Sequence, residues 1–217
     1  MVHGEFHLGK FKTSKNLNGS SVSIASLNDS AGILAVLKSN LIEIEDAEEL
    51  TSDKRQYFEE HGFLRKEVNE KFYRDLIRDH NWHIYIVKSA NNKILGFASV
   101  NNNKSNVYEF RSTLEKIYTK NERTRTLLTN VNMKFAYLDQ ISINPDYQRK
   151  GLATILLNSI LSDVNLPLVA FIVELPLANK ASAKWHEYNR FEIAATAYGN
   201  YKGKQFKWRI YIHWNRK

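Results

Sequence analysis

Apolar residues recur along the chain at two spacings, which predict alternating strands and helices. Runs in which every second residue, or nearly every residue, is apolar predict seven strands, at residues 22–27, 83–88, 94–100, 135–143, 168–174, 191–198 and 206–214. Apolar residues three and four positions apart predict helices, at residues 29–44, 53–79, 151–164 and 179–189. The second helix contains His61 and Gly62, where we expect a break. Strands and helices that alternate in this way favour the α/β class.

Two of the predicted strands carry further information about the sheet. Residues 168–174 are almost continuously apolar, so we expect a central strand that is buried on both faces. Residues 206–214 alternate strictly and follow a turn at residues 199–203, so we expect a final antiparallel pair.

Two other segments do not follow this pattern. Residues 1–20 are polar with little apolar periodicity and are predicted to form a flexible arm before a domain at residues 21–217. Residues 101–134 form an insertion in which Val107, Phe110, Leu114, Ile117 and Tyr118 predict an amphipathic helix. An ordered insertion of this length covers a neighbouring site, forms a homodimer surface or serves neither purpose, and the pattern leaves these alternatives open.

Composition excludes several classes of protein. The 217 residues, 43% hydrophobic and 25% charged, suit one globular domain with its own core. No apolar run approaches the roughly 20 residues that cross a bilayer, and residues 1–20 lack the apolar core of a secretory signal. The absence of Cys excludes disulfides, thiolate metal sites and an acyl-cysteine intermediate. We therefore expect a cytoplasmic protein with no membrane partner and no metal.

The net charge of +8 is distributed unevenly along the chain. No acidic residue follows Glu192, whereas six Lys and Arg residues do, and an acidic stretch occupies residues 43–60. Binding to nucleic acid is one explanation of such a basic end, but phosphates of a small molecule or ordinary solvated faces account for it equally well. The acidic stretch would attract a cationic ligand or simply form a solvated helix face.

Residues 139–157 contain the strongest chemical signal. An apolar strand passes through Asn144, Pro145 and Asp146 into the basic step Gln148-Arg149-Lys150-Gly151, and an apolar helix follows. The first turn of a helix has unsatisfied backbone N–H groups, and a glycine lets an anion approach them closely. The pattern fits a diphosphate site, although an ordinary strand-to-helix turn that binds nothing has the same order of elements.

Two motifs in this part of the chain resemble those of one enzyme family. The acetyl-CoA-binding motif of the GNAT-type N-acetyltransferases, Gln/Arg-x-x-Gly-x-Gly/Ala, is similar to residues 141–157, ISINPDYQRKGLATILL. Downstream, the family's Asn-initiated helix resembles residues 179–191, NKASAKWHEYNRF, except that Arg190 replaces a glycine. The resemblance implies a GNAT fold: a mixed, twisted central sheet of about six to seven strands with helices on both faces.

The resemblance also implies which residues bind acetyl-CoA, the expected co-substrate. Backbone amides of the strand before the motif would face the pantetheine arm and thioester, the loop and helix start would hold the diphosphate, and an asparagine would bind the pantetheine. The implied residues are Ile141, Ser142, Ile143, Gln148, Arg149, Lys150, Gly151, Leu152, Ala153, Thr154 and Asn179.

Three residues are candidates for proton transfer. Glu174 stands five residues before Asn179, as the catalytic glutamate does in ribosomal-protein N-terminal acetyltransferases of this superfamily, so it is the first candidate for the base. Asp139, on the strand before the motif, is the second. His186 occupies the position of a tyrosine that protonates the leaving thiolate in many relatives. A surface ion pair for Glu174 and a core position for His186 are the alternatives.

The predicted function is transfer of an acetyl group from acetyl-CoA to a primary amine by direct attack in a ternary complex. The acceptor would be a small molecule or a peptide rather than nucleic acid. Two alternatives remain open: a non-catalytic module that binds acyl-CoA, and an acetyltransferase that acts on a protein or on a substrate associated with nucleic acid.

Overall fold

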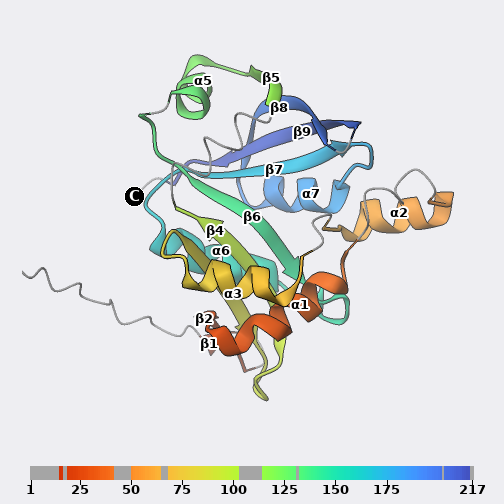
Figure 1. The fold of residues 1–217 in the computed structure, drawn as a ribbon, viewed down its shortest axis with the longest axis vertical. Helices are drawn as coiled ribbons and strands as arrows, with labels where there is room; N and C mark the ends of the chain where they lie inside the picture. Colours follow the sequence, from red (N-terminus) through yellow and green to blue (C-terminus); the bar gives the residue numbers. More distant parts are fainter. Residues whose placement is uncertain are drawn as a thin grey trace, which may run out of the picture.

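The computed structural model describes residues 15–16, 19–41, 50–64, 68–102, 114–130, 132–201 and 203–215. Nine strands in this part of the chain form one sheet in the order β1-β2-β3-β4-β6-β7-β9-β8-β5 (Figure 1). They are β1 (Lys15–Asn16), β2 (Ser20–Ile24), β3 (Trp82–Lys88), β4 (Ile94–Asn101), β5 (Leu114–Thr119), β6 (Ala136–Ile143), β7 (Leu168–Leu175), β8 (Glu192–Tyr201) and β9 (Lys204–His213). The α-helices are α1 (Ser30–Lys38), α2 (Ser52–His61), α3 (Glu70–Arg78), α5 (Glu122–Thr129), α6 (Leu152–Asp163) and α7 (Lys180–Tyr188).

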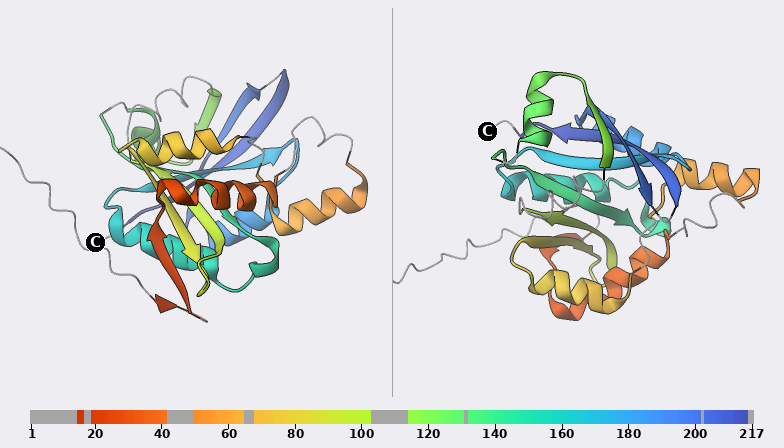
Figure 2. Two further views of the ribbon diagram at one scale, coloured as in Figure 1. Left: turned by 60° about the horizontal axis from the view of Figure 1, so that its bottom comes forward. Right: turned by 45° about the horizontal axis from the view of Figure 1, so that its top comes forward.

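Helices cover both faces of the sheet, and the views in Figure 2 show α1 and α3 on one side and α6 on the other. Apolar side chains of α1 and α3 pack on Ile84, Ile86 and Phe97. The α6 helix packs on the opposite side chains of the same strands, such as Tyr85 and Val87. None of the described helices is long and apolar enough to cross a bilayer.

The predicted α/β class, the mixed sheet and all seven predicted strands are confirmed. Central strands such as β4 are buried on both faces, which explains their nearly continuous apolar runs. The predicted break is confirmed too: Gly62, with a φ of 81°, ends α2 before α3 begins. The sheet has more strands than expected, since β1 and β5 extend its two edges. Residues 1–14, most of the predicted arm, lie outside the described residues.

Within the insertion at residues 101–134, the described part of the predicted amphipathic helix is a strand. Residues 114–119 form β5, which pairs with β8, while residues 107–113 lie outside the described part of the chain. Ile117 packs inward and Tyr118 is exposed, so the segment alternates as an edge strand does. The helix lies later, as α5, where Leu127 and Leu128 cover β8 and β9.

The sheet opens between β6 and β7, the only parallel pair among the described strands. They pair from Ala136–Leu168 to Leu138–Ala170 and then separate. At this point β6 has a bulge, because Leu138 pairs with Val100 of β4 and Gln140 pairs with Ser99, leaving Asp139 as the extra residue. We call the opening between the two strands the fork. It begins at Asp139 and Phe171, the first residues after the last pair, Leu138–Ala170.

Candidate active site

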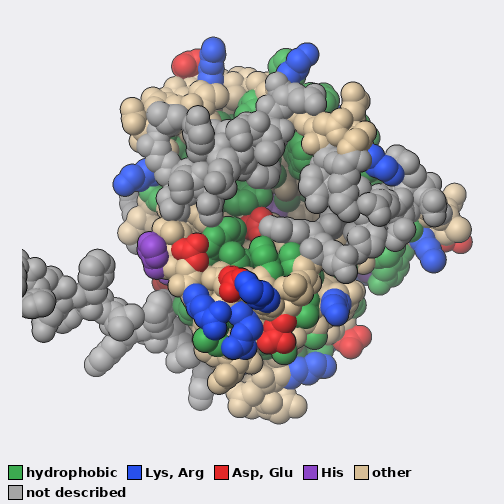
Figure 3. Space-filling model, viewed as in Figure 1, with side chains coloured by type: hydrophobic (Ala, Val, Ile, Leu, Met, Phe, Trp, Pro, Cys, Tyr) green, Lys and Arg blue, Asp and Glu red, His purple; other side chains and the backbone are tan. Residues whose placement is uncertain are grey.

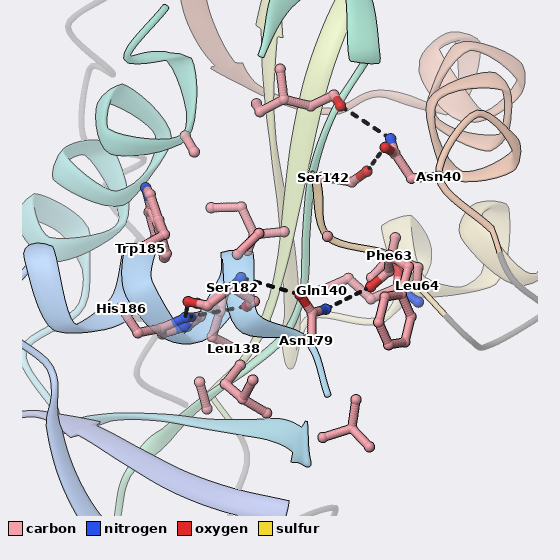
Figure 4. Close-up of a pocket in the computed structure, with 18 of the residues that line it drawn as sticks. Asn40, Phe63, Leu64, Leu138, Gln140, Ser142, Asn179, Ser182, Trp185 and His186 are labelled. Carbon is pink, nitrogen blue, oxygen red and sulfur yellow. Dashed lines mark hydrogen bonds between the residues drawn. The ribbon is translucent and has the colours of Figure 1, made fainter. Parts of the chain in front are cut away.

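A cavity of about 720 Å³ occupies the fork (Figure 4). It is lined by β6, β7, the N-terminus of α6, the inner face of α7 and the segment after α2. Because the two strands no longer pair there, the opening connects the α6 face of the sheet with the α3 face. A ligand can thus meet groups from both faces.

The start of α6 forms one end of the cavity and is a candidate anion site. Gly151, at the N-cap, has φ 78° and ψ 0°, and no side chain caps this helix. Arg149 also has a positive φ, 59°. Alternation of left-handed and right-handed residues turns successive N–H groups toward one point, and the helix dipole adds positive potential there.

Asn40, which no sequence motif marks, ties this loop to β6. Its Nδ2 donates to Ser142 Oγ at 2.9 Å and to the Ile143 carbonyl at 3.0 Å. Its Oδ1 accepts from Gln148 Nε2 at 3.2 Å. Gln148 is therefore engaged within the protein, where it fixes the loop relative to the strand.

Two of the predicted backbone amides of β6 face the opening. Asn144 donates its N–H to Leu95 of β4, and alternate residues of an antiparallel strand direct their N–H groups to the same neighbour. The amide of Ser142 therefore points to β4, whereas those of Ile141 and Ile143 point away from it, toward the cavity.

Asn179 and the segment after α2 form another wall. Asn179 caps α7 by accepting from Ser182 N at 3.1 Å, and its Nδ2 donates to the Phe63 carbonyl at 2.9 Å (Figure 4). Arg149 approaches His61 Nε2 at 3.2 Å, so the end of α2 is also tied to the anion site.

His186 lies in the cavity wall in a neutral form. It is 1% exposed, and Nδ1 lies 2.7 Å from the Ser182 carbonyl, so this nitrogen carries the proton (Figure 4). Burial lowers the pKa of His186 to about 4, despite the hydrogen bond to Ser182, which raises it. Nε2 is thus a lone-pair acceptor, and it has no hydrogen-bond partner among the described residues.

The buried histidine is expected to make stability depend on pH. Between its unfolded pKa of about 6.5 and its folded pKa of about 4, the unfolded chain binds the additional proton, so stability is lost as the pH falls through this window. The loss should reach about 3 kcal/mol. Urea titrations at several pH values give the free energy of unfolding, which should depend less steeply on pH in His186→Leu than in the unmodified protein. An equally steep dependence in both would mean that His186 is accessible to protons in the folded protein.

Glu174 lies outside the cavity. Ala170, Phe171, Ile172 and Val173 of β7 line the cavity, but Glu174 does not. Glu174 lies at a bulge of β7 and forms ion pairs with Lys207, at 2.7 Å, and with Arg209. Partial burial disfavours its charge, but the hydrogen bond from Lys207 and the charges of both cations outweigh this and lower the pKa of Glu174.

Asp139 lines the cavity at the bulge of β6. Next to it, Gln140 accepts a hydrogen bond at 2.8 Å from the hydroxyl of Tyr73, a fully buried residue of α3. Burial, and secondarily the Asp139 carboxylate, raise the pKa of Tyr73. Asp139 is therefore close to Tyr73 on the α3 side of the fork.

The fold gathers most of the predicted site residues around one cavity. The exceptions are Glu174 and Lys150, whose ammonium group binds the Asp146 carbonyl at 2.9 Å and lies over the Tyr147 ring. Asn40, which lines the cavity, and Tyr73, which binds Gln140, were missed, because a single polar or aromatic residue in or just after a helix gives no local signal of a distant partner. The described residues contain no group of three or more His, Cys, Asp or Glu that could hold a metal ion.

The model of the acetyltransferase (GNAT) family matches residues 44–187. The chain belongs to the GNAT acetyltransferase family. The resemblance of the two motifs is thus confirmed, and the fork between β6 and β7 lies within the matched region. The search of curated proteins found no match to this chain.

Solved structures share the fold at low sequence identity. The ribosomal-protein-S18-alanine N-acetyltransferase of Escherichia coli is 15% identical with a TM-score of 0.55, covering 89% of this chain and 92% of its own. A variant of the spermidine N-acetyltransferase of Vibrio cholerae is 13% identical with a TM-score of 0.51 and covers the same shares. An acetyltransferase of Thermus thermophilus is 12% identical with a TM-score of 0.51, covering 89% and 97%.

Proposed function

We propose that this GNAT protein transfers an acetyl group from acetyl-CoA to a primary amine by direct attack within a ternary complex. One observation carries the proposal: a single cavity joins the anion site at Gly151, the unpaired amides of β6 and the carboxylate of Asp139. They would serve as the phosphate site, the oxyanion site and the proton acceptor that the reaction requires.

The diphosphate of acetyl-CoA would bind the N–H groups of residues 149–154, since the α6 terminus lacks a cap. The pantetheine arm would then follow β6, with the thioester near the fork. There the N–H groups of Ile141 and Ile143 are available to the carbonyl oxygen. Asn40 and Gln148 would hold this strand and the loop in register.

Asp139 is the base we favour over Glu174. The amine nitrogen would attack the thioester carbon, its proton would pass to Asp139 directly or through water, and the C–S bond would break. Support comes from position: Asp139 lines the cavity, whereas Glu174 does not and is held by Lys207 and Arg209.

The neutral state of His186 does not suit the predicted role as an acid. Nδ1–H is bonded to the Ser182 carbonyl, and Nε2 has no proton to donate. We infer instead that the departing thiolate takes its proton from solvent, and that Nε2 then accepts a hydrogen bond from the thiol.

Calorimetric titration with acetyl-CoA, combined with an assay of thiol release, tests the function. We expect micromolar binding and release of free coenzyme A only when an amine is present. Absence of binding at millimolar acetyl-CoA would overturn the proposal. Binding without thiol release across alkylamines, polyamines, amino acids and peptides would instead identify a non-catalytic acyl-CoA module, and activity restricted to a protein or a nucleic-acid-associated substrate would support the remaining alternative.

A further inference from the structure

Aromatic side chains form a row across three neighbouring strands on the α3 side of the fork. Because side chains alternate along a strand, Tyr137 of β6 and Phe171 of β7 point to this face. On β9, Trp208 pairs with Val173, and so lies diagonal to Phe171. Phe206 is the next residue of β9 on the same face. All four residues line the cavity.

These rings pack against one another, which fixes them as a wall. The Tyr137 and Phe171 rings meet edge to face, with centroids 5.8 Å apart. The Phe206 and Trp208 rings stack at 5.4 Å. Phe63 and Val173 belong to the same apolar cluster as Phe206 and continue the wall toward the segment after α2.

The row lies between the helices of this face. Here α1 and α3 cover β3 and β4. Leu127 and Leu128 of α5 belong to an apolar cluster against which Tyr137, Phe171 and Trp208 pack, so α5 borders the row, while the rings still line the cavity. In the space-filling view, hydrophobic side chains gather in a hollow at the centre of this face, beside the charged side chains of α3 (Figure 3).

The carboxylate of Asp139 lies at one end of this aromatic row. Asp139 and Phe171 are the first residues beyond the last paired rung, Leu138–Ala170, so both flank the point where the thioester would lie. An amine at Asp139 would therefore have its substituent directed along Phe171 toward Trp208. Flat apolar groups suit such a wall, since aromatic pairs add about 0.5–1.5 kcal/mol to the burial of their surface.

We propose that the acceptor is a primary amine that lies one or two carbons from an aromatic ring. This inference rests on the proposed function. The acceptor nitrogen forms the new N–C bond, the C–S bond breaks, coenzyme A leaves as the thiol, and one amine proton passes to Asp139. The ring meanwhile occupies the wall formed by Tyr137, Phe171 and Trp208. A free arylalkylamine has this chemistry, and so does a peptide whose first residue is aromatic.

The test compares kcat/KM for four probes in the thiol-release assay: 2-phenylethylamine, a tripeptide that begins with phenylalanine, propylamine and spermidine. We expect 2-phenylethylamine, the tripeptide or both to exceed propylamine by about tenfold or more, because a complementary apolar pocket gains about 10–200-fold from added apolar groups. Which aromatic probe is preferred distinguishes a small-molecule acceptor from a peptide. If propylamine or spermidine equals or exceeds both aromatic probes, the proposal is wrong while the acetyltransferase function stands. If no amine releases thiol, the proposed function itself fails.

Variants of the wall residues then test where the aromatic ring of the acceptor binds. Trp208→Leu should reduce the preference for the better aromatic probe over propylamine by about tenfold, mainly through KM. Phe171→Leu is a second variant, in case replacement of Trp208 impairs folding, which thermal melting would show. Tyr188→Leu is the matched control, because Tyr188 is 84% exposed on α7 and does not line the cavity. An unchanged preference in folded Trp208 and Phe171 variants would overturn the proposal.

Discussion

Replacement of Asp139 by asparagine is expected to lower kcat by about a hundredfold or more, with little change in the affinity for acetyl-CoA. Removal of a general base costs about 10²–10⁴-fold, and asparagine keeps the size of the side chain while losing its basicity. Asp139 lines the cavity on the α3 side of the fork, whereas the anion site at Gly151 lies at the start of α6, so the cofactor contacts should persist. Steady-state kinetics and calorimetry on the same preparation measure the two effects.

Glu174→Gln is the matched comparison, since it removes the other candidate carboxylate in the same way. We expect kcat to fall by no more than a few fold, because Glu174 does not line the cavity and pairs with Lys207 and Arg209. A large loss in Glu174→Gln together with an active Asp139→Asn would reverse the assignment. Activity retained in both variants would leave water as the proton acceptor.

Replacement of Gly151 by valine should raise the dissociation constant of acetyl-CoA about a hundredfold. Gly151 has a φ of 78°, which a β-branched residue adopts only with strain, and the added side chain would stand where the diphosphate must approach the N–H groups of α6. Calorimetric titration gives the constant directly.

Gly203 offers a control with the same backbone strain. It also has a φ of 78°, but it lies in the turn between β8 and β9, and a Cβ there would meet no atom within 4 Å. Both valine variants should lose about 1–3 kcal/mol of stability, yet only Gly151→Val should lose affinity. Equal affinity in the two variants would mean that the diphosphate does not bind at the start of α6.

The sequence by itself determined most of the elements and the glycine at the start of α6. Strand and helix positions follow from local apolar spacing, so β2–β4, β6–β9 and the break at Gly62 were all predictable. The start of α6, where we propose that the diphosphate binds, was predictable too, because a glycine at a helix start acts through its own backbone.

Only the tertiary structure decided which side chains share the cavity and in what charge state. The spacing before Asn179 favoured Glu174, but the structure leaves it out of the cavity lining and beside two cations from β9. Burial by residues distant in sequence makes His186 neutral, and Asn40 reaches Gln148 across 108 positions of the chain. The aromatic row likewise joins three strands. Such contacts depend on strand order and the bulge at Asp139, which local spacing does not encode.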